Sequence, residues 1–107
     1  MIRDTHETTL SIAASGDTTG SLPIAGWALG RIGWPAAFTG TKVTIECQVI
    51  NGGAWLACCE DGTQLEITYT ASESERIPDV AFGCHALRFK SDDTEAAARS
   101  ITVMLVA

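Results

Sequence analysis

Four carboxylates in the middle of the sequence are the first residues that could do chemistry. Glu46, Glu60, Asp61 and Glu66 fall on neighbouring predicted strands and on the turn that joins two of them. Two carboxyl groups on facing strands can share the acid and nucleophile roles of glycoside hydrolysis. Polar and apolar residues alternate around these positions, however, which is typical of a strand face exposed to water. We therefore expect a solvated face here and no catalytic pair.

The two histidines do not complete a catalytic arrangement. His6 lies in a polar N-terminal segment, and His85 has no nucleophile or orienting acid near it in the sequence. Nucleophilic hydrolysis of the serine type needs a base that contacts both groups. Residues 15–17 and 18–20 contain glycine but lack the strand-to-helix context of a phosphate loop. We expect no catalytic residue, no cofactor and no enzymatic activity.

The spacing of the cysteines does not fit a metal site. Cys47, Cys58, Cys59 and Cys84 form no C-x-x-C pair, and adjacent residues on a strand point to opposite faces. We expect four reduced thiols that act as small apolar side chains. A disulfide that joins Cys47 to Cys58 or Cys59 is the alternative. A bound zinc ion is not expected, because each histidine stands alone.

The tryptophans raise a different class of function. Trp27, Trp34 and Trp55 could stack on sugar rings if they were exposed, as in a carbohydrate-binding module. Trp34 precedes the apolar segment 35–40 and Trp55 opens a strand, and both settings favour burial. Trp27 lies between two small residues, so we expect it at the surface or at a partner interface.

Strands must position these residues, and the clearest strand covers residues 42–49. Its odd-numbered positions are apolar and its even-numbered positions are polar, which is the period of a half-buried strand. Asn51-Gly52 follows, a dipeptide that favours a type I′ turn with positive φ at both residues. The chain should reverse there and pair residues 42–50 with the segment that begins near Trp55.

Similar patterns predict further short strands. Asp61-Gly62 predicts a second hairpin, between residues 55–60 and 63–70, which would make a three-stranded meander with the central strand. The remaining expected strands cover residues 9–13, 24–34, 87–90 and 100–106. Leu29 and Ile32 are three residues apart, so we expect a bulge at Gly30 or Arg31 to bring them to one face.

The segments between the strands carry fewer signals. Residues 35–40 are too apolar for an exposed loop, so we expect Phe38 to fold inward and cover one end of the core. Residues 77–80 predict a single helical turn with proline near its start. Residues 92–99 fit a two-turn helix or a loop equally well.

The whole pattern predicts an all-β fold. About seven to eight short strands with closely spaced turns indicate a compact antiparallel β-sandwich, jelly-roll-like in arrangement. A chain of 107 residues is expected to form one domain, over residues 10–107. Residues 1–9 are polar and lack periodicity, so we expect a flexible N-terminal arm.

Charge and hydropathy exclude two classes of partner. The net charge is −6 and the seven Lys and Arg residues are scattered, so no basic surface for nucleic acid is expected. No apolar run approaches the length of about 20 residues that spans a membrane. Only 19% of the residues are charged, which favours a protein that spends its time packed against a partner.

The order of several motifs resembles a family of small tailed-bacteriophage virion proteins. The family pattern reads L-x-x-I-x-x-P-A-A-W-T, then an alternating strand, then D-G-G-x-W. This sequence matches it from Leu29 to Trp55, with Phe38 where tryptophan is usual and Asn51 where aspartate is usual. The resemblance continues to the C-terminus, through Asp61-Gly62 and the last two predicted strands. Both departures keep an apolar plug and a good turn residue.

The resemblance implies a structural role in a virion. Members of this family are expected to be compact β-sandwiches without catalytic activity. The resemblance points to a capsid decoration, or cement, protein that is made in the host cytoplasm and binds the outer surface of the major capsid protein beside neighbouring copies of itself. Head fibre, connector and tail proteins are alternatives within the same class, and a carbohydrate-binding module is the alternative from another class.

The expected partner interface combines the arm with one tryptophan. An arm of nine residues reaches about 30 Å when extended, enough to cross a subunit boundary. We expect the arm to become ordered when it binds a neighbouring subunit. The residues that we expect at the interface are Arg3, Asp4, Thr5, His6, Glu7, Thr8 and Trp27.

Overall fold

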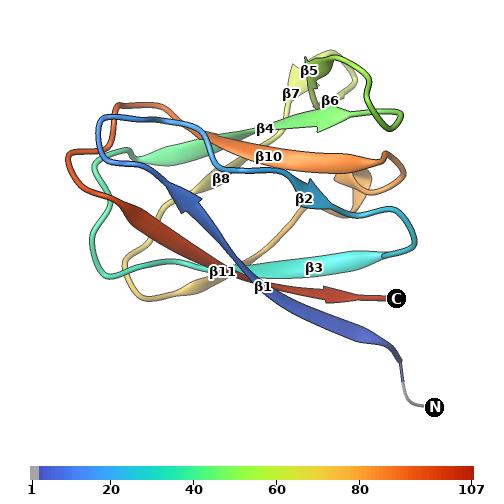
Figure 1. Cartoon of the computed structure of the whole chain (residues 1–107), viewed down its shortest axis with the longest axis horizontal. Coiled ribbons are helices and arrows are strands. Elements are labelled where there is room, and N and C mark those ends of the chain that lie inside the picture. Colours follow the sequence, from blue (N-terminus) through green and yellow to red (C-terminus); the bar gives the residue numbers. More distant parts are fainter. Residues whose placement is uncertain (1–2) are drawn as a thin grey trace.

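Two antiparallel sheets face each other in the computed structural model, which describes residues 3–107 (Figure 1). Sheet A has the strand order β1-β11-β3-β9, and sheet B has the order β2-β10-β4-β5, with β8 also paired to β4. A short hairpin of β6 and β7 stands apart. The bounds of the strands are β1 (Thr5–Ile12), β2 (Leu22–Pro23), β3 (Leu29–Gly33), β4 (Lys42–Gln48), β5 (Trp55–Ala57), β6 (Cys59–Glu60), β7 (Thr63–Gln64), β8 (Glu66–Thr68), β9 (Ser74–Arg76), β10 (Ala86–Ser91) and β11 (Arg99–Val106).

The predicted all-β class and the antiparallel sandwich are confirmed. The strands number eleven over residues 3–107, more than expected. The predicted strands 55–60 and 63–70 are each divided in two, and β2 and β9 form where no strand was predicted, while the predicted strand 24–34 is confined to residues 29–33. The core lies between the sheets. Leu87 and Phe89 of β10 and Ile101, Val103 and Leu105 of β11 all point inward as predicted, and each is at most 4% exposed. Burial of each such side chain stabilises the fold by about 1.5–3 kcal/mol.

The N-terminal segment corrects a prediction. Residues 1–9 were expected to be a flexible arm, yet β1 begins at Thr5 and pairs with β11 over its whole length, from Thr5 opposite Val106 to Ile12 opposite Arg99. The polar residues 5–9 show no apolar alternation because their exposed side chains contribute little. Backbone pairing with β11 orders them instead. Met1 and Ile2 lie outside the described residues.

Strand β3 has no bulge. Its pairing with β11 runs without interruption from Leu29 opposite Val106 to Gly33 opposite Thr102. The inward position that precedes Ile32 is Gly30, where a Cβ would lie 2.9 Å from Leu105 Cδ2. Glycine is therefore required here by the close approach of the core, and Leu29 lies on the other face.

The predicted hairpin at Asn51-Gly52 is confirmed as a pairing but not as a type I′ turn. Gln48 of β4 lies opposite Trp55 of β5, as expected. The connection is longer than two residues, and of the dipeptide only Gly52 has a positive φ, of 78°. The turn is closed by Gly53, whose N–H donates to Ile50 O at 3.0 Å.

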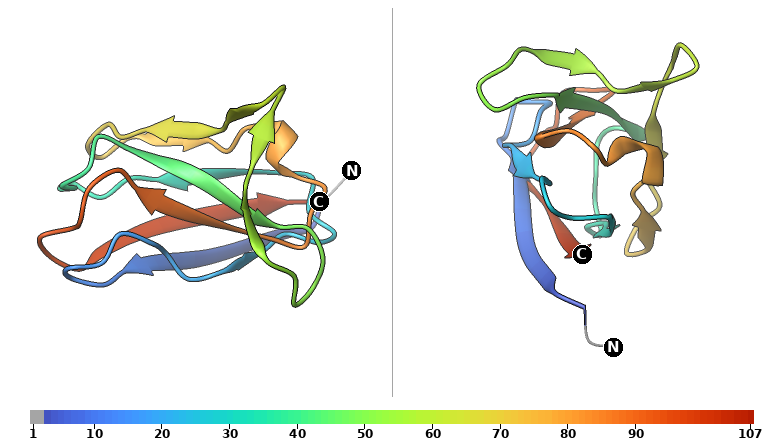
Figure 2. Two further views of the ribbon diagram at one scale, coloured as in Figure 1. Left: turned by 90° about the horizontal axis from the view of Figure 1, so that it is seen from above. Right: turned by 90° about the vertical axis from the view of Figure 1, so that its right-hand side faces the viewer.

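The second predicted hairpin, at Asp61-Gly62, has the expected geometry. Asp61 and Gly62 both have positive φ, of 50° and 80°, as a type I′ turn requires. This hairpin does not complete a simple meander, because sheet B divides at Ile45. There, Ile45 N–H donates to Leu65 O and Ile45 O accepts from Cys58 N–H, both at 2.9 Å. Residues 59–64 thus leave the sheet and cross the end of the sandwich (Figure 2).

The predicted plug and helical turn are found, and the C-terminal alternative is resolved. Phe38 packs against Trp34 and Tyr69, with ring centroids 5.3 and 5.2 Å apart. A single 3-10 turn, η1 (Asp79–Ala81), follows Pro78. Residues 92–98 form a loop, and β11 begins at Arg99, so the segment contains no helix.

The reason for that loop is Glu95, whose side chain is fully buried. Its two carboxylate oxygens accept hydrogen bonds from the backbone N–H groups of Thr39 and Gly40, at 2.8 and 3.0 Å. Ser91 Oγ donates to it at 2.9 Å, and Arg99 Nε forms an ion pair with it at 2.9 Å. Every oxygen of this buried carboxylate is therefore satisfied, as burial of a charge demands.

Glu95 joins the three loops at one end of the sandwich, on the left in Figure 1. Its side chain holds the β3–β4 loop to the β10–β11 loop. Its backbone pairs with the β1–β2 loop, since Ser15 N–H donates to Glu95 O and Glu95 N–H donates to Gly16 O, both at 2.8 Å. Each of these loops carries the chain from one sheet to the other. One residue thus fixes how the sheets lie over each other.

Substitution Glu95→Gln should destabilise the fold strongly. Glutamine keeps the size but removes the charge that binds three neutral donors and Arg99, and loss of one member of a buried pair costs about 3 kcal/mol. Urea unfolding at pH 7 measures the free energy of unfolding. The matched control is Glu66→Gln, because Glu66 pairs with Lys42 at 2.8 Å on an exposed surface, and its loss should leave that free energy nearly unchanged.

The pH dependence gives a second reading of the same substitution. Burial raises the pKa of Glu95, but the hydrogen bonds from Thr39, Arg99, Gly40 and Ser91 outweigh burial and hold the pKa below its usual value of 4.5. The carboxylate therefore stabilises the native state above that value, and the contribution is lost as the pH falls through the native pKa. The difference between wild type and Glu95→Gln should shrink in acid. A difference that is constant from pH 7 to pH 3 would contradict this role.

Candidate functional site

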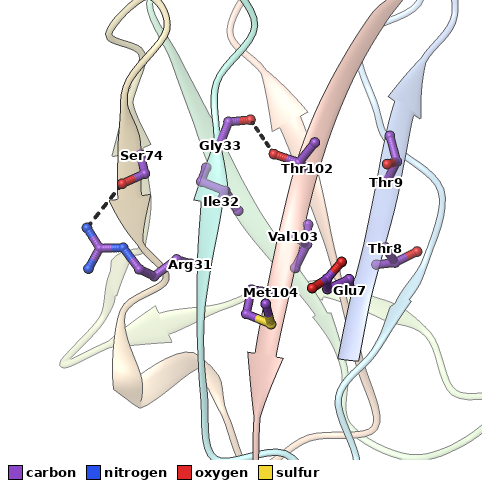
Figure 3. Close-up of a pocket in the computed structure, with 10 residues that line it drawn as sticks. All are labelled: Glu7, Thr8, Thr9, Arg31, Ile32, Gly33, Ser74, Thr102, Val103 and Met104. Atoms are coloured by element: carbon purple, nitrogen blue, oxygen red, sulfur yellow. Dashed lines mark hydrogen bonds between the residues drawn. The ribbon is translucent and has the colours of Figure 1, made fainter. Parts of the chain in front are cut away.

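A groove lies on the outer face of sheet A (Figure 3). This groove has a volume of about 570 Å³ and draws residues from all four strands of the sheet. The outer face is the one that the core does not use, so its side chains are free to contact another molecule. The lining residues are Glu7, Thr8, Thr9, Arg31, Ile32, Gly33, Ser74, Thr102, Val103 and Met104. Of these, Ile32 and Val103 direct their side chains into the core, and Thr8 shares the inner face with Val103.

One row of small residues makes the floor of the groove. Strand register places Thr9, Thr102, Gly33 and Ser74 side by side across β1, β11, β3 and β9. Gly33 has no side chain to fill the space above it, and a Cβ there would lie 2.3 Å from Thr102 Oγ1. A larger residue at position 33 would force the Thr102 hydroxyl group to move, and glycine leaves the sheet hollow at this point.

A second row, one step along the strands, carries charge. It places Glu7, Met104 and Arg31 side by side, with Met104 in the middle and 36% exposed. Arg31 Nη2 donates to Ser74 Oγ at 3.4 Å, on one side of the groove. Over residues 3–107 neither Glu7 nor Arg31 forms an ion pair. A partner could therefore pair with both charges and cover the methionine between them.

The groove combines polar and charged groups with an apolar centre. Its outward side chains offer three hydroxyl groups, from Thr9, Ser74 and Thr102, together with one carboxylate, one guanidinium group and a thioether. Hydroxyl and charged groups around a flexible apolar centre suit recognition of another surface. The lining contains no imidazole or thiol, the groups that most often act as base or nucleophile at neutral pH.

The structure divides the predicted interface residues between two places. Glu7 points into the groove, whereas the neighbouring Thr8 borders the groove but directs its side chain to the inner face of β1. His6 lies on the inner side of β1 at the end of the sandwich, where its ring stacks on that of Trp27 with centroids 5.9 Å apart and planes at 24°. Asp4 O accepts a hydrogen bond from Ala107 N–H at 3.0 Å, which joins the two ends of the described chain.

The two remaining predicted residues lie near these but join neither group. Arg3 is exposed and precedes β1, and Thr5 is exposed opposite Val106. The seven residues therefore do not share one surface. The main groups of the groove that the sequence prediction missed are Arg31, Ser74, Thr102 and Met104. Alternation on residues 100–106 already placed Thr102 and Met104 outward, but nothing local to the sequence joined them to Arg31.

The tryptophans do not form a common platform. Trp34 is in the core at 5% exposure, as predicted, with its Nε1 unpaired. Trp27 is half-buried beneath His6. Trp55 was expected in the core but lies on the outer face of sheet B, with the guanidinium carbon of Arg88 4.5 Å from its ring centroid. A cation above the ring is a stabilising contact, and it occupies the face that a sugar would need.

Two of the four central carboxylates are paired with cations, and the other two, Glu60 and Asp61, are exposed. Glu46 Oε1 pairs with Arg88 Nε at 2.7 Å, and Glu66 Oε2 pairs with Lys42 Nζ at 2.8 Å. The hydrogen bond and the charge of Glu66 raise the pKa of Lys42. These pairs agree with the predicted solvated strand face.

The thiols lie in two kinds of environment. All four cysteines are free, which agrees with the expected reduced state. Cys47 and Cys58 are buried, Cys84 is half-buried against the core, and Cys59 is exposed on β6. Burial raises the pKa of Cys58 to about 12, so this thiol stays protonated and is a poor nucleophile. Among residues 3–107 no group of three or more His, Cys, Asp and Glu side chains is placed to hold a metal ion.

Comparison with known proteins finds likeness in the fold alone. No family model and no curated protein matches the sequence. The SPBc2 prophage-derived protein YomS has a similar structure, with a TM-score of 0.69 and 12% identity over 100% of this chain and 96% of that one. A cupin domain from Bordetella pertussis Tohama I has a TM-score of 0.50 and 10% identity over 100% of this chain and 84% of the other. The described part of the chain has no helix long and apolar enough to cross a membrane.

The reactivity of the four thiols should follow their burial. In the native protein we expect a thiol reagent to modify exposed Cys59 first and half-buried Cys84 more slowly, while Cys47 and Cys58 react only on unfolding. Intact-mass analysis under native and then denaturing, non-reducing conditions measures this order. Two adducts instead of four after unfolding would establish a disulfide.

Proposed function

We propose that this chain is a non-enzymatic structural protein of a tailed-bacteriophage virion, and within that class a capsid decoration protein that binds the outer surface of the major capsid protein shell. The observation that carries the proposal is the likeness to the prophage-derived protein YomS, which extends over the whole of this chain. It agrees with the independent resemblance of residues 29–55 to small phage virion proteins.

The groove on sheet A supports a binding role without chemistry. Glu7 and Arg31 flank the exposed Met104 on a face braced by four strands. A partner that brings opposite charges and an apolar side chain would satisfy all three residues. The rigid sheet lowers the entropy cost of such docking, because little has to be ordered.

Shell stabilisation follows from mass action. A protein that binds assembled capsid subunits and not dissociated ones shifts the equilibrium toward the shell. The partners in this proposal are the major capsid protein and neighbouring copies of the chain. Nucleic acid and membrane are not partners, since the net charge is −6 and the basic residues are scattered.

The alternatives differ in what they would require. A head fibre, connector or tail protein would use the same fold at another place in the virion. A carbohydrate-binding module would need an exposed aromatic platform, and none of the three tryptophans supplies one: Trp34 is buried, and His6 and Arg88 cover the rings of Trp27 and Trp55.

Substitution Met104→Glu should weaken binding to purified capsid shells by at least about tenfold. The new carboxylate would lie at the centre of the contact beside Arg31, so it would both remove the apolar side chain and neutralise a charge that the partner is expected to pair with. Co-sedimentation of the protein with shells measures the bound fraction. The matched control is Leu56→Glu, which adds the same charge at a 53% exposed position of sheet B and should bind as wild type does.

Two results would overturn parts of this proposal. Equal binding of Met104→Glu and wild type would remove the groove from the interface. A wild-type protein that sediments with tails and not with shells would remove the assignment to the capsid.

A further inference from the structure

Strand β1 is an unusually long free edge for so small a sandwich. It has eight residues, whereas the other edge strands, β9, β2, β5 and β8, have two or three. Proteins protect free edges with short strands, proline, lysine or bulges. The edge strand β2 contains Pro23, but β1 has no proline, lysine or glycine, and its pairing with β11 is free of bulges. Along one margin of the left view of Figure 2, β1 lies open.

The hydrogen-bond pattern shows which backbone groups face outward. Asp4 O accepts from Ala107 N–H, so Asp4 and Ala107 form a hydrogen-bonded pair that extends the β1–β11 register. Such pairs alternate with pairs whose N–H and C=O groups point away from each other. The residues of β1 whose groups point to the free edge are therefore Thr5, Glu7, Thr9 and Ser11. Within residues 3–107 no other segment bonds to these groups.

We propose that β1 pairs in antiparallel fashion with β1 of a second copy of this chain. A two-fold axis at Thr8 would join the two four-stranded sheets A into one continuous sheet. It would place Glu7 of each copy opposite Thr9 of the other, and Thr5 opposite Ser11. All four outward residues of each copy then find backbone partners.

The sequence of β1 is complementary to itself in this register. Inner positions stay on the inner face, because His6 meets Leu10 and Thr8 meets Thr8. Directly opposed β-branched residues are favourable cross-strand pairs. If the two-fold axis lay at Glu7 instead, the register of the two strands would shift by two residues. Glu7 of one copy would then lie opposite Glu7 of the other, and two opposed like charges are unfavourable. The same patch on both copies is what a two-fold contact requires.

This inference deepens the proposed function, because it gives neighbouring copies on a shell a surface through which to touch. It also extends the groove, since Glu7 and Thr9 line both the groove and the shared edge. Binding to a shell would raise the local concentration of copies and strengthen a contact that is weak in solution. The test below uses the isolated protein, so its failure would leave shell binding by single copies untouched.

Substitution Thr9→Pro should prevent the pairing and leave the monomer folded. Proline removes the outward N–H of Thr9, and its ring blocks the partner strand, but the bonds to β11 come from the neighbouring residues. Sedimentation equilibrium should show wild type approaching twice the monomer mass as concentration rises toward about 1 mM, and a dissociation constant at least about tenfold higher for Thr9→Pro. The control Thr9→Val keeps the N–H and the branched shape, so it should associate as wild type does.

Amide hydrogen exchange of the wild-type protein tests the same contact without a substitution. Exchange at Glu7, Thr9 and Ser11 should slow as concentration rises, whereas exchange on β9 should not change. A protein that stays monomeric to about 1 mM, or one that associates equally with Thr9→Pro while β1 amides remain unprotected, overturns the proposal. If Thr9→Pro does not fold, as far-ultraviolet circular dichroism would show, the exchange result decides.

Discussion

The fold depends most on one buried carboxylate. Glu95 lies where three loops carry the chain between the sheets, and its side chain and backbone bond to all three. A charged group without water is stable only when every oxygen has a donor. The three loops can therefore meet in few other ways. These three loops are therefore less flexible than most loops, and they hold sheet A in a fixed position over sheet B. The outer faces of the two sheets keep a constant shape as a result.

The outer face of sheet A is held in place by the same anchor. Strand β11 is fixed at its start by Arg99 on Glu95, and it pairs with β1 on one side and β3 on the other. Its outward residues Thr102 and Met104 thus become the centre of the groove. Backbone pairing with the same strand also orders the polar residues 5–9, whose exposed side chains contribute little to folding. Strand β11 therefore connects the buried Glu95, the groove on sheet A and the free edge of β1.

Sequence reasoning found what periodicity can show. Alternation placed β4, β10 and β11 and the inward residues of each, because burial on one face of a strand has a period of two. It missed the first half of β1, where pairing and not burial orders the chain, and it read Gly30 as a bulge because the space taken by Leu105 comes from another strand. Glu95 was missed for the same reason: its donors lie at Thr39 and Gly40, more than fifty positions away. The groove combines four strands, and no local pattern joins them.

The central claim is that this chain is a structural component of the capsid. The most direct measurement is quantitative mass spectrometry of purified virions of the phage that encodes it, with heads and tails separated before digestion. The account predicts the chain in the head fraction, at a copy number comparable with that of the major capsid protein and far above that of any connector protein. Its absence from virions, or its presence only in tails, would contradict the account.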